Sequence, residues 1–184
     1  MIETGLYIAL GLALVIGLLL VVASRRPDSN RMEYSERIAA APEAIFPLIN
    51  DLKAFSTWSP FERKDPNIKS VYSGPQSGVG NRHDWEGNRE VGAGWCRITR
   101  SVPFSRVEME LHMQRPVKCS SDVTFTLVPE GGSTVVTWSI EGPMPLIAKV
   151  MDVVIGMERM CGGEFRAGLA NLKETVERGQ DAAA

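Results

Sequence analysis

Few side chains in this 184-residue chain have the types and spacing that metal or acid–base chemistry requires. The two histidines, His83 and His112, belong to different segments, and there is no HExxH or paired-cysteine motif. A metal site needs three or four converging His, Cys or carboxylate ligands, so we expect no metal. The chain also lacks the GxSxG motif of serine hydrolases and the P-loop of nucleotide-binding enzymes, and we expect no other cofactor.

His83 is the better candidate for chemistry. It shares strand parity with Trp85, so a cavity that receives one of these side chains receives the other. There the imidazole could bind a ligand carbonyl or act as a general acid or base near neutral pH. The alternative is a histidine at the rim, or one whose hydrogen bonds are satisfied by a backbone group. His112 alternates with apolar residues, so we expect it on the solvent face.

The remaining polar and sulfur-containing candidates favour structural roles. Cys96, Cys119 and Cys161 are odd in number and lack CxxC spacing, which predicts neither a disulfide framework nor a redox site. We expect them to be small buried hydrophobes. Either Arg97 or Arg100 is expected to reach inward, as a structural arginine paired with an acid.

The chain begins with a predicted transmembrane anchor, residues 1–23. From Thr4 to Ala23 there is no charged residue, and about 20 helical residues span roughly 30 Å, the thickness of a hydrocarbon core. Arg25 and Arg26 follow the apolar run, whereas a secretory signal peptide has its positive charge before it. The positive-inside rule then predicts a single-pass membrane protein whose C-terminal domain is cytoplasmic.

Small residues recur at every fourth position of this anchor, at Gly5, Ala9, Ala13 and Gly17. Such a stripe permits close contact between helices in lipid and would support a homodimer. The alternative is that Gly and Ala are simply common in membrane helices. A polar linker, residues 24–31, follows the anchor and keeps the next domain close to the bilayer.

Hydrophobic patterning predicts one α+β domain over residues 32–178, followed by a disordered tail over 179–184. The chain is 44% hydrophobic with a net charge of −2, which excludes wholesale disorder and argues against nucleic-acid binding. Alternation of apolar and polar residues predicts seven strands, near 32–38, 68–72, 81–86, 95–102, 107–113, 123–127 and 136–140. Helices are predicted after Pro42, through Phe55 and Trp58, over 146–155, and over a long stretch ending near Arg178.

Several local motifs in this order resemble one superfamily. Residues 38–51 and Trp58-Ser59-Pro60 match its opening strand and helix. Residues 72–75, 85–88 and 91–94 match its middle, and residues 125–127, 131–138 and 165–172 match its end. Over about residues 32–178 the chain thus resembles the SRPBCC, or START-like, helix-grip superfamily, close to its polyketide cyclase/dehydrase and lipid-transport branch.

The resemblance implies a curved antiparallel sheet of about seven strands wrapped around the long C-terminal helix. It also implies a cavity between sheet and helix that takes hydrophobic small molecules. The apolar faces supply the expected lining, which comprises Trp58, His83, Trp85, Met109, Leu111, Met113, Phe125, Trp138, Phe165, Leu169 and Leu172. The same residues would equally form an ordinary filled core.

Three functions fit these expectations. The first is a membrane-anchored binding module for a lipid, an isoprenoid or quinone, or an aromatic polyketide-like molecule. The second is a cyclase or dehydratase that uses His83 as its acid or base. The third is a protein-interaction or chaperone-activator-like module with a filled core. Fold alone does not choose among them.

Overall fold

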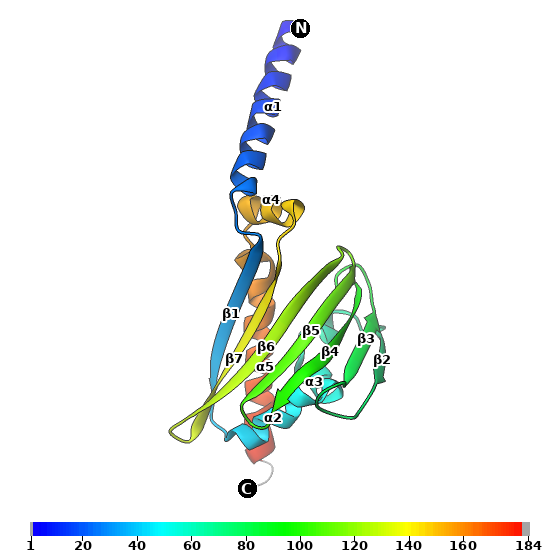
Figure 1. The fold of residues 1–184 in the computed structure, drawn as a ribbon, viewed down its shortest axis with the longest axis vertical. Helices are drawn as coiled ribbons and strands as arrows, with labels where there is room; N and C mark the ends of the chain where they lie inside the picture. The colour runs from blue at the N-terminus through cyan, green and yellow to red at the C-terminus, as the bar shows by residue number, and fades with distance from the viewer. Residues whose placement is uncertain (1, 182–184) are drawn as a thin grey trace.

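The computed structural model describes residues 2–181; within it, the side chains of residues 2, 3, 157, 160, 161, 180 and 181 lie outside the description. An N-terminal helix stands apart from an α+β domain (Figure 1). The helices are α1 (Ile2–Ser24), α2 (Pro42–Asn50), α3 (Leu52–Trp58), a 3-10 turn η1 (Glu62–Lys64), α4 (Leu146–Val154) and α5 (Met157–Asp181). The strands are β1 (Ser29–Ile38), β2 (Lys69–Ser73), β3 (Arg82–Glu86), β4 (Ala93–Val102), β5 (Arg106–Arg115), β6 (Cys119–Glu130) and β7 (Ser133–Pro143).

The seven strands form one antiparallel sheet in the order β1-β7-β6-β5-β4-β3-β2. The predicted α+β helix-grip fold is confirmed. Pairing between β4 and β5 shifts register near Ala93 and again between Ile98 and Arg100. Such irregularities bend a strand and increase its twist, which helps the sheet curve around the helices on its inner face.

Helices α2 and α3 lie on the inner face of the sheet. Local signals in the sequence determine where each helix begins. Pro42 opens α2 at a position where a helix needs no N–H donor. The carboxylate of Asp51 caps α3 by accepting from the backbone N–H groups of Lys53 at 2.8 Å and Ala54 at 3.3 Å. This cap starts the turn that carries Phe55 and Trp58 into the core.

Five aromatic side chains form the centre of the core, and we call them the aromatic cluster: Phe55, Trp58, Phe125, Trp138 and Phe165. The ring of Trp138 lies 4.9 Å from that of Phe125 and 4.7 Å from that of Phe165, centroid to centroid. Gly168 permits this packing, because a Cβ there would come within 2.7 Å of the Trp138 ring. The cluster fills the space between the sheet and α5.

Helix α5 covers only part of the sheet. It packs chiefly against β1, with further contacts to β7, α2 and α3. A helix is about 10 Å across and strands are about 4.8 Å apart, so one helix shields roughly two strands. The inner face of β3, β4 and β5 is therefore left to α3 and η1, which are much shorter.

The structure corrects the expected linker and the end of the last helix. Strand β1 begins at Ser29 and pairs with β7 from there, so part of the linker predicted over 24–31 belongs to the sheet. The residues before Met32 were not recognised as strand because they are all polar, and therefore show no alternation of apolar and polar residues. Helix α5 runs to Asp181, past the end expected near Arg178, and residues 182–184 of the predicted tail lie outside the described chain.

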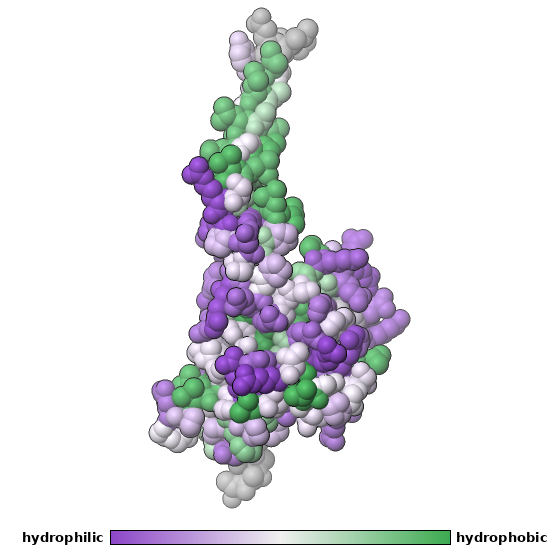
Figure 2. Space-filling view, viewed as in Figure 1, coloured by the Kyte–Doolittle hydropathy of each residue, from purple (hydrophilic) through white to green (hydrophobic). Residues whose placement is uncertain are grey.

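Helix α1 is long and apolar enough to cross a membrane over Thr4–Ser24. Its side chains are almost all exposed, and Figure 2 shows it as a column of hydrophobic surface above the domain. Helix α4 lies crosswise at the foot of α1 and contacts it (Figure 1). The apolar column therefore meets the domain at α4.

Candidate functional site

The inner face of β3, β4 and β5 forms one wall of a cavity of about 210 Å³. Helix α3 and the segment around η1 close the other side. The lining is mostly apolar and comprises Phe55, Ser59, Phe61, Glu62, Ile68, His83, Trp85, Glu90, Val91, Cys96, Met109, Leu111, Met113, Val123 and Trp138. Among the described side chains, none from α5 contributes to it.

The eleven residues predicted to line a cavity separate into two groups. Six of them share the wall of this cavity: His83, Trp85, Met109, Leu111, Met113 and Trp138. The other five are packed in the core: Trp58, Phe125, Phe165, Leu169 and Leu172. Strand and helix periodicity identified inward side chains in both groups, but the position of α5 decides which of them meet empty space.

Three side chains of one cross-strand row line the cavity: His83, Cys96 and Leu111. Register pairs Tyr72 with His83, His83 with Cys96, and Cys96 with Leu111, so these four side chains cross from β2 to β5. The Tyr72 and His83 rings stack with centroids 4.5 Å apart. This stacking and the strand pairing hold the imidazole in one orientation.

Two buried polar atoms on the cavity wall have no hydrogen-bond partner within the described chain: His83 Nε2 and Trp138 Nε1. Buried polar atoms are nearly always paired, and leaving one unpaired costs about 1–3 kcal/mol. Burial lowers the pKa of His83 from its ordinary 6.5 to about 4. The imidazole is therefore neutral at pH 7 and free to bind a polar ligand atom.

Glu62 is a site residue that sequence reasoning missed. Its carboxylate Oε1 lies 3.7 Å from His83 Nε2, and burial raises the pKa of this carboxyl above its ordinary value. Glu62 comes from the single 3-10 turn η1, which carries no periodic pattern, so no signal in the sequence linked it to His83. Together the two side chains give the apolar cavity one polar end.

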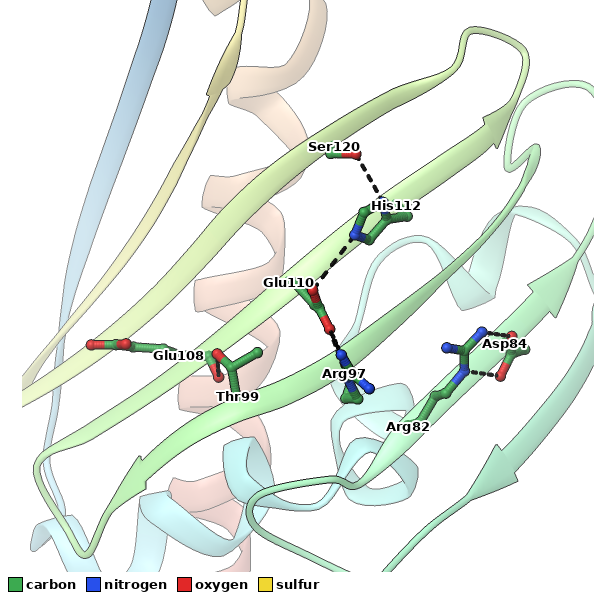
Figure 3. A network of polar contacts seen from close by, with 8 residues as sticks. All are labelled: Arg82, Asp84, Arg97, Thr99, Glu108, Glu110, His112 and Ser120. Atoms are coloured by element: carbon green, nitrogen blue, oxygen red, sulfur yellow. Dashed lines mark hydrogen bonds and ion pairs between the residues drawn. The ribbon is translucent and has the colours of Figure 1, made fainter.

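His112 belongs to a different polar network, on the outer face of the sheet (Figure 3). Its Nδ1 lies 2.8 Å from Ser120 Oγ and its Nε2 lies 3.6 Å from Glu110 Oε2, an order reminiscent of a catalytic triad. Arg97 also binds Glu110, with 2.6 Å between Nε and Oε1. These side chains lie on a partly solvent-exposed sheet face, and none of them lines the cavity, so we interpret the network as structural.

The same network corrects the expectation that Arg97 or Arg100 reaches inward. Both are exposed on the outer face, where Arg97 pairs with Glu110 and Arg100 with Glu108. The reason is strand parity, since the bulge between Ile98 and Arg100 returns Arg100 to the outer face. Arginine in these positions joins β4 to β5.

The cysteines differ from one another. Cys96 is a free thiol on the cavity wall, and burial raises its pKa to about 12, so it is an unreactive apolar group at neutral pH. Cys119 is exposed, contrary to expectation, because it begins β6 where no helix covers the inner face. The side chain of Cys161 lies outside the description. Within residues 2–181, no group of three His, Cys, Asp or Glu side chains is placed to hold a metal.

Comparison with known proteins finds a family model that matches the domain. Residues 29–177 match the model of the family described as polyketide cyclase / dehydrase and lipid transport. The match confirms the resemblance found in the sequence. No curated protein sequence is significantly similar to the chain.

Solved structures share the fold at low sequence identity. A protein from Chromobacterium violaceum is 18% identical, with a TM-score of 0.57 over 83% of this chain and 99% of that one. One from Mesorhizobium loti is 16% identical, with a TM-score of 0.59 over 81% and 98%. The Aha1 dimer from Colwellia psychrerythraea is 16% identical, with a TM-score of 0.57 over 80% and 96%. These similarities show the fold and leave the activity open.

Burial of His83 predicts a specific pH dependence of stability. The unfolded chain binds a proton on this imidazole below about pH 6.5, whereas the folded protein binds it only near pH 4. The free energy of unfolding should therefore fall as the pH is lowered from 6.5 to about 4. Glu62 acts in the opposite direction, because its raised pKa lets the folded protein hold a proton that the unfolded chain releases.

Denaturant unfolding of the full chain in detergent, measured across this pH range, tests the prediction. The His83→Gln variant should lose most of the slope. The His112→Gln variant, the same change on the outer face, should keep it. Equal slopes in the parent and His83→Gln would show that His83 is not held neutral by the fold.

Proposed function

Because the chain belongs to the polyketide cyclase/dehydrase and lipid-transport family, we propose that it binds a compact hydrophobic molecule in this cavity, next to a membrane. The observation that carries the proposal is the apolar cavity with two unpaired polar atoms on its wall. An apolar wall alone would suit any hydrophobic ligand of the right size. The orphaned imidazole and indole nitrogens favour a ligand with a polar atom at one end.

Cavity size restricts the ligand. An apolar cavity of about 150 Å³ holds benzene, so the 210 Å³ here suits a ligand with one or two rings or a short isoprenoid segment. Burying about 200 Å² of its apolar surface is worth roughly 5 kcal/mol before ordering costs. Met109 and Met113 add adaptable side chains to the wall. A lipid larger than the cavity could place only one end of its molecule inside.

The two unpaired nitrogens, Trp138 Nε1 and His83 Nε2, would recognise the polar part of the ligand. The Trp138 indole can only donate a hydrogen bond, so it suits a carbonyl or hydroxyl oxygen. The His83 and Glu62 side chains can exchange a proton and would suit a hydroxyl group. A ligand carrying one such oxygen removes the cost of leaving these atoms unpaired.

The membrane part of the proposal rests on α1. A helix of this length and composition spans a hydrocarbon core, and its exposed apolar surface has no cover within the described chain. The arginines that follow it favour an anchor over a cleaved signal peptide and a cytoplasmic domain over an external one. The stripe Gly5, Ala9, Ala13 and Gly17 would permit a homodimer within the bilayer.

Two ligands that differ by one hydroxyl group, 2-naphthol and naphthalene, test the binding proposal. We expect the affinity ratio of 2-naphthol over naphthalene to fall about tenfold in Trp138→Phe, since one buried donor is worth about 1.4 kcal/mol. Equilibrium dialysis of the full chain in detergent, with empty micelles as reference, measures this ratio. An unchanged ratio would contradict a role for the indole N–H in binding.

Filling the cavity supplies the complementary test. Leu111→Trp places an indole in the cavity and should abolish binding of both ligands. Val71→Trp adds the same bulk at an exposed position of β2 and should leave both affinities intact. Ligand binding that survives Leu111→Trp would place the binding site elsewhere.

A second candidate function, an enzyme acting on a carbonyl compound, is favoured by the His83–Glu62 pair. The neutral imidazole would take a proton from the carbon beside a ligand carbonyl, while the oxygen accepts a hydrogen bond from Trp138. Returning the proton to a different carbon would complete an isomerisation. Delivering it to a hydroxyl group on the β-carbon, whose C–O bond then breaks to release water, would complete a dehydration. This is the chemistry of the cyclase or dehydratase alternative.

Isotope exchange distinguishes the enzyme from the binding module. If the pair is catalytic, the full chain in D₂O should accelerate exchange of the α-hydrogens of 1-tetralone, measured by proton NMR. His83→Gln should abolish the acceleration and leave 2-naphthol bound. Exchange at the buffer rate with the parent protein would leave binding alone as the function of the cavity.

Sidedness of the domain can be read from Cys119, whose thiol is exposed. A cytoplasmic domain predicts that a membrane-impermeant maleimide reaches Cys119 only after cells expressing the full chain are permeabilised. The Cys119→Ser variant identifies the signal that belongs to this thiol. Labelling of Cys119 in intact cells would reverse the assigned topology.

A further inference from the structure

Helix α4 exposes a group of apolar side chains beside the foot of α1. Leu146, Ile147 and Val154 are 52, 58 and 63% exposed, and Ile155, just after the helix, is 48% exposed. Helical spacing places the first three on one side of α4. Elsewhere in the described chain beyond α1, the exposed large apolar residues are scattered singly: Phe61, Val71, Val79, Phe104, Val117 and Val128.

The other side of α4 is fastened to the end of α1. Lys149 packs its stem inside the protein and its ammonium lies 2.6 Å from Asp28 Oδ1. Arg26 pairs with Asp152 at 3.7 Å. The backbone N–H of Met144 donates to the carbonyl of Asp28 at 2.7 Å. These contacts hold α4 against the segment that follows α1, so the position of α4 relative to α1 is fixed.

Figure 2 shows the consequence for the surface. The hydrophobic column of α1 continues on one side of its lower end onto the region of α4, while hydrophilic residues occupy the other side of this junction. Apolar surface of this kind is costly in water. At the end of a membrane-spanning helix, the surface that would cover it is the bilayer itself.

We propose that α4 is an interfacial helix, lying in the headgroup region of the bilayer that α1 spans, with Leu146, Ile147 and Val154 directed into the acyl boundary. An amphipathic helix that lies flat buries its apolar side about 5–10 Å into this boundary. The inference rests on the proposed membrane-anchoring role of α1. It adds a second membrane contact that prevents the domain from swinging freely on its tether.

The second contact orients the cavity. Ile68, Glu90, Val91 and Met113 line it where β2 begins, where β3 turns into β4 and where β5 ends. In Figure 1 these strand ends lie on the side of the domain from which α4 and α1 project. With α4 in the interface, the cavity lies in the membrane-proximal part of the domain, and a ligand leaving the bilayer has a short path to it.

Tryptophan quenching by lipid tests the position of α4. The full chain is reconstituted in vesicles of phosphatidylcholine brominated at carbons 6 and 7 of one acyl chain. The native chain has four tryptophans, so Ile147→Trp or Val154→Trp should lose up to about one fifth of its emission when the added indole lies near the acyl boundary. Val128→Trp, at the exposed β6–β7 end of the sheet, should lose none beyond the parent.

A third position separates failure of this inference from failure of the anchor. Leu12→Trp, in the middle of α1, should be quenched if α1 spans the bilayer. Quenching of Leu12→Trp without quenching of Ile147→Trp and Val154→Trp would overturn the interfacial helix alone. A blue-shifted but unquenched indole at these positions would show a protein surface covering α4 and also overturn it. Absence of quenching at Leu12→Trp would overturn the anchor and the inference together.

Discussion

A single helix cannot cover a seven-stranded sheet, and this limit shapes the rest of the domain. Helix α5 packs chiefly against β1, where Phe165 and Trp138 complete the aromatic cluster. Beyond the reach of α5, the inner faces of β3, β4 and β5 have only α3 and η1 above them. Inward-facing side chains are therefore tightly packed near β1, under α5, and line open space near β4. The cavity follows from the unequal cover of one continuous sheet.

Several cavity-lining residues come from the ends of β2–β5, and these strand ends lie on the side of the domain from which α1 and α4 project (Figure 1). The polar groups with unusual environments, His83, Glu62 and Trp138, belong to the cavity wall, whereas the ion pairs of β4 and β5 belong to the outer face. Such a separation suits a protein that takes an apolar molecule with one polar atom from a membrane. It also leaves room for proton transfer, because the neutral His83 sits beside Glu62 in an apolar surrounding.

Much of the fold was readable from alternation and helical period. The pattern of β5 placed Met109, Leu111 and Met113 inward and His112 outward, as the structure does. Sequence could not tell that Phe165 and Leu172 would be packed away from the cavity, because that depends on where α5 crosses the sheet. The position of Glu62 on the cavity wall could not be predicted, because a single 3-10 turn is too short to show a periodic pattern of apolar residues. The interfacial role proposed for α4 could not be read from the sequence, because it rests on the contacts of α4 with the residues after α1.

Native mass spectrometry of the full chain, extracted from cells with a mild detergent, tests the central claim most directly. The account predicts that a compact hydrophobic molecule copurifies with the parent in a fixed ratio and is absent from Leu111→Trp. Binding should also return when the parent, stripped of ligand, is incubated with a membrane extract. A parent protein that is empty after extraction and remains empty after that incubation would contradict the account.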